Sequence, residues 1–433
     1  MLSEQRRFEG SAISYPWGIP IAIESGRGAT IRDVDGNTFI DFFAGAGVLN
    51  VGHGNPSVVA AASEQQKLLV HALDFPTPAK SRLIQALRPL LPGRLAERAK
   101  FHFGGPTGSD AVESAIKLAQ VHTGRNGVIA FHGSYHGMTG AALSASSNSS
   151  LPGRQIGPVH FLPYPYTYRG TLDWDETSPR LAGVALLESC LADPLSGVTK
   201  PAAVIVEPIQ GEGGTIVPPA GFLREVRRVT AEHDVLLIVD EIQTGFGRTG
   251  SMFACEEEGI SPDIITLAKA LGGIGYPVSC IAYDERCDDW QPGAHIGTFR
   301  GHQVGMAAGA AAIEYMHRTA LVDHARDLGE MAFVFLRTAA ENLPAIGDVR
   351  GRGLFIGVEL VRDPESREPW PELACGLRSA CANRGLIFEI GGHFDNVVRF
   401  LPPLVISRSL LEEGLQIFVD TLEALEASRA GRR

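Results

Sequence analysis

The sequence predicts an α/β protein with a large domain, built on a mostly parallel sheet between helices, and a smaller α+β domain. Three observations predict it. Short apolar runs alternate with helical patterns between about residues 100 and 315, as they do where crossover helices cover both faces of a parallel sheet. The length of 433 residues exceeds that of one ordinary domain. From about residue 320, long helical patterns surround only two strand-like runs, which indicates a second unit.

The large domain is expected to contain strands wherever a short apolar run is bounded by turn residues. Helical patterns at Pro56–Leu73 and Lys80–Leu91 precede the first of these strands. The stretch Ser144–Pro165 is rich in Ser, Pro and Gly and is interpreted as irregular, as segments of a site or an interface often are. The strand candidates are Lys100–Phe103, Gly127–Phe131, Ala202–Glu207, Val235–Asp240, Ile264–Leu267 and Val278–Ala282.

The two ends of the chain predict the smaller domain. A hairpin that turns at Asp35-Gly36 is expected near the start. Two strand candidates, Gly353–Leu360 and Val397–Phe400, and a closing helix over Ser407–Ala427 are expected near the end. The expected boundaries are an N-terminal segment of the small domain over residues 1–70, a large domain over 71–320 and a C-terminal small domain over 321–433.

Charge, hydropathy and cysteine usage exclude several classes of protein. The formal net charge of −11 and the lack of a basic arm argue against nucleic acid or an anionic membrane as a partner. No run of about 18 apolar residues occurs and the first residues lead into no apolar segment, so neither a membrane span nor a signal peptide is expected. The six cysteines are scattered without C-x-x-C spacing, which fits reduced thiols. We therefore expect a cytoplasmic protein.

The most informative stretch joins two predicted strands and carries a carboxylate and a lysine. The apolar run Val235–Val239 stops at Asp240, and the run that starts at Asp263 leads into Lys269. Because ligands of open α/β sheets bind beyond the carboxyl ends of the strands, both side chains can face one pocket. Pyridoxal phosphate (PLP) enzymes need that pair, a lysine for the Schiff base and a carboxylate for the pyridinium nitrogen. Either residue alone is more often a turn cap or a solvated lysine.

Two loops that follow predicted strands could complete a cofactor site. Thr107, Gly108 and Ser109 lie between a strand end and a helix start, where backbone amides and the helix dipole suit a phosphate. Tyr135 follows the next strand and could stack on a flat ring, with His136 beside it. Taken alone, the first loop is more often a plain capped helix start, and Tyr135 is more often a packed loop aromatic. The two histidines of the second loop lack a clustered third ligand, so no metal is expected.

Two acids and an arginine complete the pattern. Glu207 ends an apolar run, and Glu212 follows in a glycine-rich loop that leads into no helix and so is no dinucleotide fingerprint. Arg399 follows two apolar residues and precedes a rigid Pro-Pro pair. A guanidinium held this way binds a carboxylate through two hydrogen bonds, and Glu212 on a mobile loop could pair with it and release it. The same spacing also fits a structural ion pair or a surface arginine.

Together these segments resemble the class III aminotransferases, PLP-dependent enzymes of fold type I that act on ornithine, GABA and other ω-amino acids. The resemblance covers nearly the whole chain. Within the class, Asp41–Asn50 and Gly297–Gly301 resemble the 2,4-diaminobutyrate aminotransferases, which move a terminal amino group to or from aspartate semialdehyde with glutamate and 2-oxoglutarate as the other pair. The matching segments are Gly52–Pro56, Thr107–Glu113, Tyr135–Gly137, Glu207–Gly214, Asp240–Gly250, Lys269, Gly297–Phe299 and Arg399–Pro403.

The resemblance implies a seven-stranded sheet, pyridoxal 5'-phosphate as the cofactor and a role for each matching residue. Lys269, Asp240 and Glu207 are the implied catalytic residues. Lys269 forms the Schiff base and moves the proton, and Asp240 pairs with the pyridine nitrogen. The other implied cofactor contacts are Thr107, Gly108 and Ser109 at the phosphate, Tyr135 and His136 at the ring, Gln243 at the ring oxygen and Thr298 at the phosphate of the partner subunit's cofactor.

The resemblance also implies amino acid and 2-oxo acid substrates and a homodimer with shared active sites. Tyr15, Glu212 and Arg399 are the implied substrate-binding residues. Arg399 holds the carboxylate of glutamate or 2-oxoglutarate, and Glu212 is its alternate partner. Two other classes stay open, namely a PLP enzyme that performs elimination, epimerisation or carbon–carbon bond formation, and a cofactor-free binding protein. Glu212 and Arg399 together favour transamination, because such a switch serves two alternating substrates.

Five positions depart from the usual pattern of the diaminobutyrate subgroup, and one of them is Ala268, where serine is common. That subgroup carries Arg-Ser-Tyr-Pro-Arg near its start, whereas Ile13 and Trp17 stand at the two arginine positions here. Val51 replaces a tyrosine, and His302 replaces the asparagine of Arg-Gly-Asn. The N-terminal segment lines the substrate pocket in this class, so the amino donor is not fixed by the resemblance.

Overall fold

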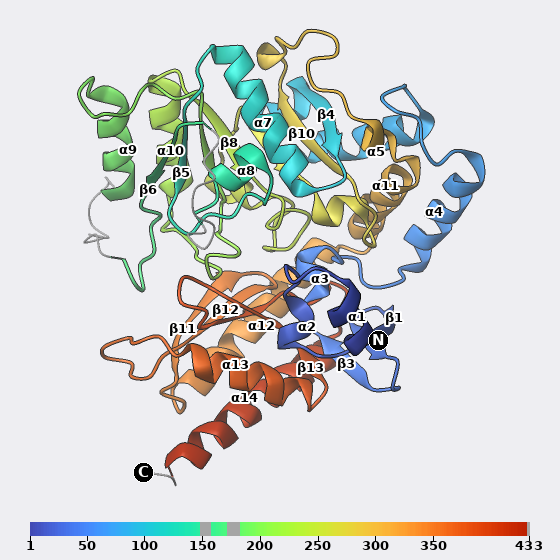
Figure 1. Cartoon of the computed structure of the whole chain (residues 1–433), viewed down its shortest axis with the longest axis vertical. Coiled ribbons are helices and arrows are strands. Elements are labelled where there is room, and N and C mark those ends of the chain that lie inside the picture. Colours follow the sequence, from blue (N-terminus) through green and yellow to red (C-terminus); the bar gives the residue numbers. More distant parts are fainter. Residues whose placement is uncertain (148–156, 171–181, 431–433) are drawn as a thin grey trace.

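A seven-stranded sheet lies at the centre of the larger unit of the chain (Figure 1). The computed structural model describes residues 1–147, 157–170 and 182–430. The strand order is β4-β10-β9-β8-β7-β5-β6, and β10 runs antiparallel to both of its neighbours. The strands are β4 (Ala99–Gly105), β5 (Val128–Phe131), β6 (Val159–Leu162), β7 (Ala203–Val206), β8 (Leu236–Asp240), β9 (Ile264–Leu267) and β10 (Ser279–Asp284). The predicted α/β class with a mostly parallel sheet is confirmed.

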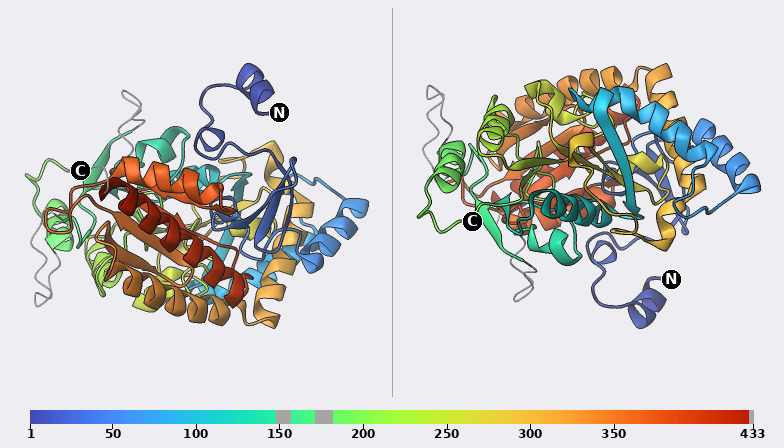
Figure 2. Two further views of the ribbon diagram at one scale, coloured as in Figure 1. Left: turned by 90° about the horizontal axis from the view of Figure 1, so that it is seen from below. Right: turned by 90° about the horizontal axis from the view of Figure 1, so that it is seen from above.

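Alternate residues of the central strands face two separate cores. In β8, Leu237 and Val239 belong to one apolar cluster, whereas Leu236 and Ile238 belong to another. Every residue of β8 is buried. A strand that is buried on both faces has a continuous apolar sequence, and this makes the central strands recognisable in the chain. Each cluster holds a layer of helices against one face of the sheet (Figure 2).

Helices form these two layers. On one face, α7 (Gly108–Thr123) packs on β4, β9 and β10. On the other face, α10 (Phe222–Glu232) packs on β8, and α11 (Gln303–Arg318) contributes to the same core. The other helices of this unit are α4 (Pro56–Leu68), α5 (Pro78–Leu87), α6 (Leu95–Arg98), α8 (Gly140–Ser144) and α9 (Ala182–Ala192), with 3-10 turns at Arg88–Leu90, Ala254–Glu258, Lys269–Gly272, Glu285–Cys287 and Thr298–Gly301. In the part of the chain that the structure describes, no helix combines the length and the apolar character needed to cross a bilayer.

The smaller unit is built from both ends of the chain, which lie together below the large sheet in Figure 1. One of its sheets has the order β1-β2-β3-β13, so a strand from near the C-terminus pairs in parallel with one from near the N-terminus. The other, β11-β12-β15-β14, is antiparallel. The strands of the smaller unit are β1 (Ile23–Arg27), β2 (Thr30–Asp33), β3 (Thr38–Asp41), β11 (Ile346–Arg352), β12 (Phe355–Leu360), β13 (Leu386–Ile387), β14 (Glu389–Gly391) and β15 (Val397–Phe400). Its helices are α1 (Leu2–Phe8), α2 (Tyr15–Gly18), α3 (Ala44–Gly47), α12 (Leu321–Ala340), α13 (Pro371–Ala382) and α14 (Arg408–Ala430).

The interpretation of Ser144–Pro165 as irregular is wrong for part of that stretch. Strand β6 lies within it and completes the sheet at one edge. Because only Leu162 of this strand is fully buried, no continuous apolar run marks it. Residues 148–156 of the stretch lie outside the described residues.

The division of the chain into domains is a separate question from the fold class. Helix α4 packs against α11 of the larger unit, although it falls within the predicted N-terminal segment 1–70. The boundaries 1–70, 71–320 and 321–433 therefore remain a proposal for how the chain divides.

Candidate active site

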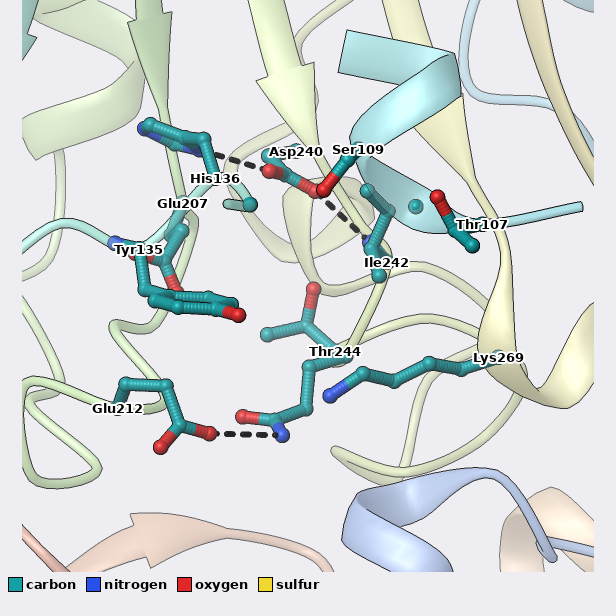
Figure 3. Close-up of a pocket in the computed structure, with 13 residues that line it drawn as sticks. Thr107, Ser109, Tyr135, His136, Glu207, Glu212, Asp240, Ile242, Thr244 and Lys269 are labelled. Atoms are coloured by element: carbon teal, nitrogen blue, oxygen red, sulfur yellow. Dashed lines mark hydrogen bonds and ion pairs between the residues drawn. The ribbon is translucent and has the colours of Figure 1, made fainter. Parts of the chain in front are cut away.

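All predicted cofactor residues except Thr298 meet in one cavity at the carboxyl edge of the large sheet (Figure 3). Strand β8 ends at Asp240, and Lys269 follows the end of β9. Parallel strands bring such distant segments together because their carboxyl ends share one edge. The cavity has a volume of about 210 Å³ and is lined by Thr107, Gly108, Ser109, Tyr135, His136, Gly137, Glu207, Glu212, Asp240, Ile242, Gln243, Thr244 and Lys269.

Both oxygens of the Asp240 carboxylate are held by the protein. Oδ2 lies 2.7 Å from Nδ1 of His136. Oδ1 accepts hydrogen bonds from the Thr266 hydroxyl at 2.9 Å and from the Ile242 N–H at 3.1 Å. The His136 side chain is fully buried, and its Nε2 has no hydrogen-bond partner among the described residues. A carboxylate fixed in this way can stabilise a positive charge that a ligand brings into the cavity.

Lys269 enters the cavity from a strained backbone position. Its φ of 48° lies in the left-handed region that residues other than glycine rarely adopt. Its Nζ donates to the Ala46 carbonyl at 2.9 Å. Burial lowers the pKa of Lys269 to about 8, although the nearby Glu212 opposes this shift. A lysine with such a pKa loses its proton at mildly alkaline pH and becomes a nucleophile.

The start of α7 lines one end of the cavity and suits an anion there. The first N–H groups of a helix have no partner within the helix, and the helix dipole strengthens their attraction for an anion. Asp110 Oδ2 accepts the Thr107 N–H at 2.9 Å and its hydroxyl at 2.8 Å, which fixes the turn. The Ser109 hydroxyl accepts a backbone N–H from the loop after β5 at 3.1 Å. A Cβ at Gly108 would lie only 3.0 Å from Ile242, so glycine fits the close packing here.

Glu207 holds two loops together at the edge of the cavity. Its Oε1 accepts the Tyr135 N–H and its Oε2 accepts the Gly211 N–H, both at 2.9 Å. Burial raises the pKa of Glu207 to about 7. These contacts favour a positioning role, because Glu207 orients the Tyr135 loop and the loop that carries Glu212. The catalytic role expected for Glu207 stays a prediction.

An ion pair between Glu212 and Arg399 adjoins the cavity. Arg399 Nη1 lies 2.9 Å from Glu212 Oε2, and Nη2 donates to Gln243 Oε1 at 2.9 Å. The Gln243 amide nitrogen donates to the Ala46 carbonyl at 3.1 Å and lies 3.5 Å from Glu212 Oε1, a contact drawn in Figure 3. Burial would raise the pKa of Glu212, but Arg399 and Lys269 outweigh it and hold that pKa below its usual value. The Arg399 side chain is 1% exposed and that of Glu212 is 40% exposed, so the glutamate is the partner with room to move.

Two other predicted site residues lie outside the lining of the cavity. Tyr15, in α2, has its ring 5.1 Å from that of Phe43 and is 53% exposed. Burial, Glu389 and Glu212 together raise the pKa of Tyr15 to about 12. Thr298 is exposed in a 3-10 turn. The substrate role of Tyr15 and the role of Thr298 across a subunit interface stay predictions.

The structure adds two groups that the motifs do not include. The Ala46 carbonyl accepts from both Lys269 and Gln243. A main-chain oxygen has no signature in residue type, and the one signal is the run of small residues Ala44–Gly47, where Ala46 has a φ of 61°. The other group is the Thr266 hydroxyl on Asp240. Its signal is a single polar residue within the apolar run of β9.

The cavity fits pyridoxal 5'-phosphate in four respects. The start of α7 suits the phosphate, and the fixed carboxylate of Asp240 suits the protonated ring nitrogen. Lys269 offers an amine whose pKa is already lowered, and Tyr135 offers a ring that lines the cavity (Figure 3). When bound, the cofactor supplies an aldehyde that takes up an amino group and a ring that withdraws electrons.

Comparisons with known proteins agree with this geometry. The family profile described as Aminotransferase class-III matches residues 14–422. The chain is 42% identical to the diaminobutyrate–2-oxoglutarate aminotransferase of Rhizobium meliloti over 95% of this chain and 90% of that one. It is 40% identical to the enzyme of the same name from Haemophilus influenzae, over 99% and 96% of the two chains. Its structure matches that of an (S)-enantioselective omega-transaminase from Thermomicrobium roseum with a TM-score of 0.87 and 28% identity, over 98% and 97%. The chain therefore belongs to the class III aminotransferases, with pyridoxal 5'-phosphate as its cofactor.

Proposed function

We propose that this enzyme transfers the terminal amino group of 2,4-diaminobutyrate to 2-oxoglutarate, which yields aspartate semialdehyde and glutamate. The substrates are those in the names of the relatives from Rhizobium meliloti and Haemophilus influenzae. The structural observation that carries the proposal is the ion pair of 2.9 Å between Glu212 and Arg399 beside the cavity. An aminotransferase binds two substrates in turn, and this pair offers each of them a different surface.

The ion pair can act as a switch between the two substrates. Glutamate has a carboxylate on the carbon that carries the transferred amino group, and Arg399 can bind it with two hydrogen bonds once Glu212 moves away. The terminal amino carbon of 2,4-diaminobutyrate has no carboxylate, so the buried Arg399 would face it as an unpaired charge. Glu212 then remains on Arg399 and neutralises it.

The other residues of the cavity hold groups in place or move a proton. Lys269 Nζ can take a proton from the carbon that carries the amino group and deliver it elsewhere, because a pKa of about 8 lies close to neutral pH. Asp240 stabilises a positive charge at the base of the cavity. Glu207 keeps the Tyr135 loop and the Glu212 loop in register through its two backbone hydrogen bonds.

We further propose a homodimer in which the active sites lie at the subunit interface. Large apolar side chains are exposed around Thr298, with Ile296 at 74% and Phe299 at 71%. At the end of α4 and in the loop that leads to α5, Leu68 is 81% and Phe75 is 66% exposed. An apolar surface of this kind marks an interaction site, and a second copy is the commonest partner. Sedimentation of the loaded enzyme should give a dimer, and a monomer that binds PLP with full affinity would contradict this.

We also place the enzyme in the cytoplasm. All six of its cysteines are free thiols. Reducing compartments keep cysteines in that state, whereas secreted proteins pair them. Cell fractionation that recovers the enzyme with soluble cytoplasmic proteins would support this location.

A single-turnover experiment tests the proposed reaction. The PLP-loaded enzyme is mixed with one amino donor at a time and without a 2-oxo acid. The donors are 2,4-diaminobutyrate, ornithine, lysine and glutamate. We expect 2,4-diaminobutyrate and glutamate to convert the absorption of the aldehyde form into that of the amine form, with aspartate semialdehyde as the product of the first. A 2-oxo acid product from 2,4-diaminobutyrate would mean transfer of the wrong amino group, and loss of donor without conversion would mean a different reaction.

A further inference from the structure

A second acid and a second arginine lie near the Glu212–Arg399 pair. Glu389 belongs to β14 and Arg378 to α13, and both strand and helix are parts of the smaller unit. Within the described part of the chain, neither side chain forms an ion pair at hydrogen-bond distance. The two residues are available to a ligand that carries both signs of charge.

Glu389 shares a face of its sheet with Arg399. The two residues lie directly opposite each other in the antiparallel pair β14 and β15, so their side chains project from the same face. On the other side of Arg399, the opposite residue is Gly357, which places no side chain there. Burial raises the pKa of Glu389 to about 6, while Arg399 opposes the rise. Glu389 is therefore a half-buried acid that a cationic ligand would stabilise.

Arg378 presents its guanidinium to the backbone of α2. A Cβ built on Gly18 would lie 2.3 Å from Nη2 and 2.7 Å from Nη1 of Arg378. The Nε of Arg378 is buried and has no hydrogen-bond partner among the described residues. Helix α13 also packs on β14, which brings Arg378 within electrostatic reach of Glu389. Arg378 thus supplies a cation next to the N-terminal segment, where Ile13 and Trp17 supply none.

Tyr15 connects this pair with the switch. It lies on α2, as Gly18 does, and both Glu389 and Glu212 contribute to the raised pKa of its hydroxyl. Burial and these acids raise the pKa of Tyr15 to about 12, so the hydroxyl keeps its proton and can donate a hydrogen bond to a carboxylate.

We propose that Glu389 binds the α-ammonium and Arg378 the α-carboxylate of 2,4-diaminobutyrate, an inference that rests on the proposed function. The end of this substrate that lies away from the transferred amino group is a zwitterion. An acid opposite Arg399 and a guanidinium within electrostatic reach of that acid match it in charge, and both gain a partner when it binds. Arg378 would supply a cation that the N-terminal segment lacks at Ile13 and Trp17.

The covalent structures of the two amino donors give each charged residue a separate duty. In 2,4-diaminobutyrate and in glutamate alike, a carboxylate carbon lies four bonds from the transferred nitrogen, so Arg378 can serve both donors. Only glutamate has a further carboxylate on the reacting carbon, which is the ligand of Arg399. Only 2,4-diaminobutyrate has an ammonium beside the distant carboxylate, which is the ligand of Glu389.

Two variants and four amines test this division. Arg378→Gln should lower the second-order rate constant of the single turnover for 2,4-diaminobutyrate, glutamate and 4-aminobutyrate by about ten- to a hundredfold, as the loss of a charged hydrogen bond does. It should spare 1,3-diaminopropane, which has no carboxylate. Glu389→Gln should produce a similar loss for 2,4-diaminobutyrate and 1,3-diaminopropane. It should spare glutamate and 4-aminobutyrate, which have no second ammonium.

Arg6→Gln is the matched control. Arg6 is another guanidinium near the N-terminal segment, and it lies 5.0 Å above the Trp17 ring. This variant should leave the constants of all four amines unchanged. Each test variant should react normally with at least one amine, and that normal rate constant shows that the loaded variant is folded. Where an amine reacts too slowly, its inhibition constant against 2,4-diaminobutyrate replaces the rate constant.

The outcomes separate the subsite from the proposed function. A wild-type enzyme that does not react with 2,4-diaminobutyrate overturns the proposed function and the subsite with it. A wild-type enzyme that reacts, but whose Glu389→Gln variant loses glutamate as strongly as 2,4-diaminobutyrate, overturns the subsite alone. The subsite is likewise overturned if Arg378→Gln has no effect on 2,4-diaminobutyrate or if Arg6→Gln has the same effect.

Discussion

The cofactor side and the substrate side of the cavity are held in different ways. On the cofactor side, the carboxylate oxygens of Asp240 and Glu207 all have protein partners, at 2.7 to 3.1 Å. On the substrate side, Glu212 is 40% exposed, and the Nε atoms of Arg399 and Arg378 have no partner among the described residues. The protein completes the first set of contacts by itself and leaves the second set for a ligand to complete.

This difference follows from what each side has to bind. A group that stays bound through every cycle is best served by a preorganised, rigid site. Two substrates that alternate need contacts that can be exchanged, and a ligand shifts such contacts only by its own differential affinity. A substitution on the cofactor side should therefore impair both half-reactions alike, whereas a substitution of Glu212, Arg399 or Glu389 should separate them.

Replacement of Lys269 should have the largest effect. Lys269→Ala removes the amine that we propose to hold PLP covalently and to move the proton, and proton transfer alone contributes about two to four orders of magnitude in rate. Turnover with either substrate should fall by at least that factor, and the visible absorption of the bound cofactor should change. Steady-state kinetics and an absorption spectrum measure both. Lys67→Ala, at an exposed lysine of α4, is the control and should behave as wild type.

Asp240→Asn should come next. It keeps the shape of the side chain but removes the negative charge that stabilises a protonated ring nitrogen. We expect rates to fall by about a hundredfold or more in both half-reactions, with the thermal unfolding temperature little changed. A loss of less than about tenfold, or roughly 1.4 kcal/mol in the barrier, would assign this task to another group.

The Glu212 and Arg399 variants should separate the half-reactions. A charged hydrogen bond is worth about 1.5–3 kcal/mol, so Arg399→Ala should weaken the reaction of glutamate by roughly ten- to a hundredfold and spare 2,4-diaminobutyrate. Glu212→Ala should do the reverse. Single-turnover kinetics with each donor measure the two effects. If both variants impair both half-reactions equally, the substrate side of the cavity does not differ from the cofactor side in the way described.

The smallest effect concerns the stability of the cofactor-free protein. The pKa of Lys269 is about 8 in the folded chain and near its ordinary 10.5 when unfolded, so between these values the unfolded chain binds more protons. The free energy of unfolding should therefore rise between pH 8 and pH 10 because of Lys269, by on the order of 2 kcal/mol. Urea unfolding should show this rise in wild type and in Lys67→Met but not in Lys269→Met. The same pH dependence of the free energy of unfolding in all three proteins would mean that the folded chain does not lower the pKa of Lys269.

The cofactor side could be predicted from the sequence because its residues stand at the ends of recognisable elements. Asp240 ends a continuous apolar run and Lys269 follows another, and the rule that parallel strands share a carboxyl edge then brings them together. The start of α7 was recognisable by its small residues in the same way. The positions of these residues need no knowledge of side-chain packing.

The substrate side could not be predicted to the same extent. Glu389 lies in a strand of three residues, and its position opposite Arg399 depends on a register that no apolar run reveals. Arg378 comes from a helix whose contact with Gly18 joins the two ends of the chain. The Ala46 carbonyl is a main-chain group, and its one signal is the run of small residues Ala44–Gly47. The strands differ in the same way. The sequence of β8 is a continuous apolar run that predicts a buried strand, whereas β11 is half polar and has no such run.

The parallel pairing of β3 with β13 has a consequence for the order in which the chain folds. Ile40 is synthesised long before its partner Leu386. The central sheet, whose strands lie between Ala99 and Asp284, can assemble while β3 still has an open edge. An open edge invites pairing with strands of other chains. The N-terminal hairpin therefore keeps an unpaired edge during synthesis until β13 pairs with β3.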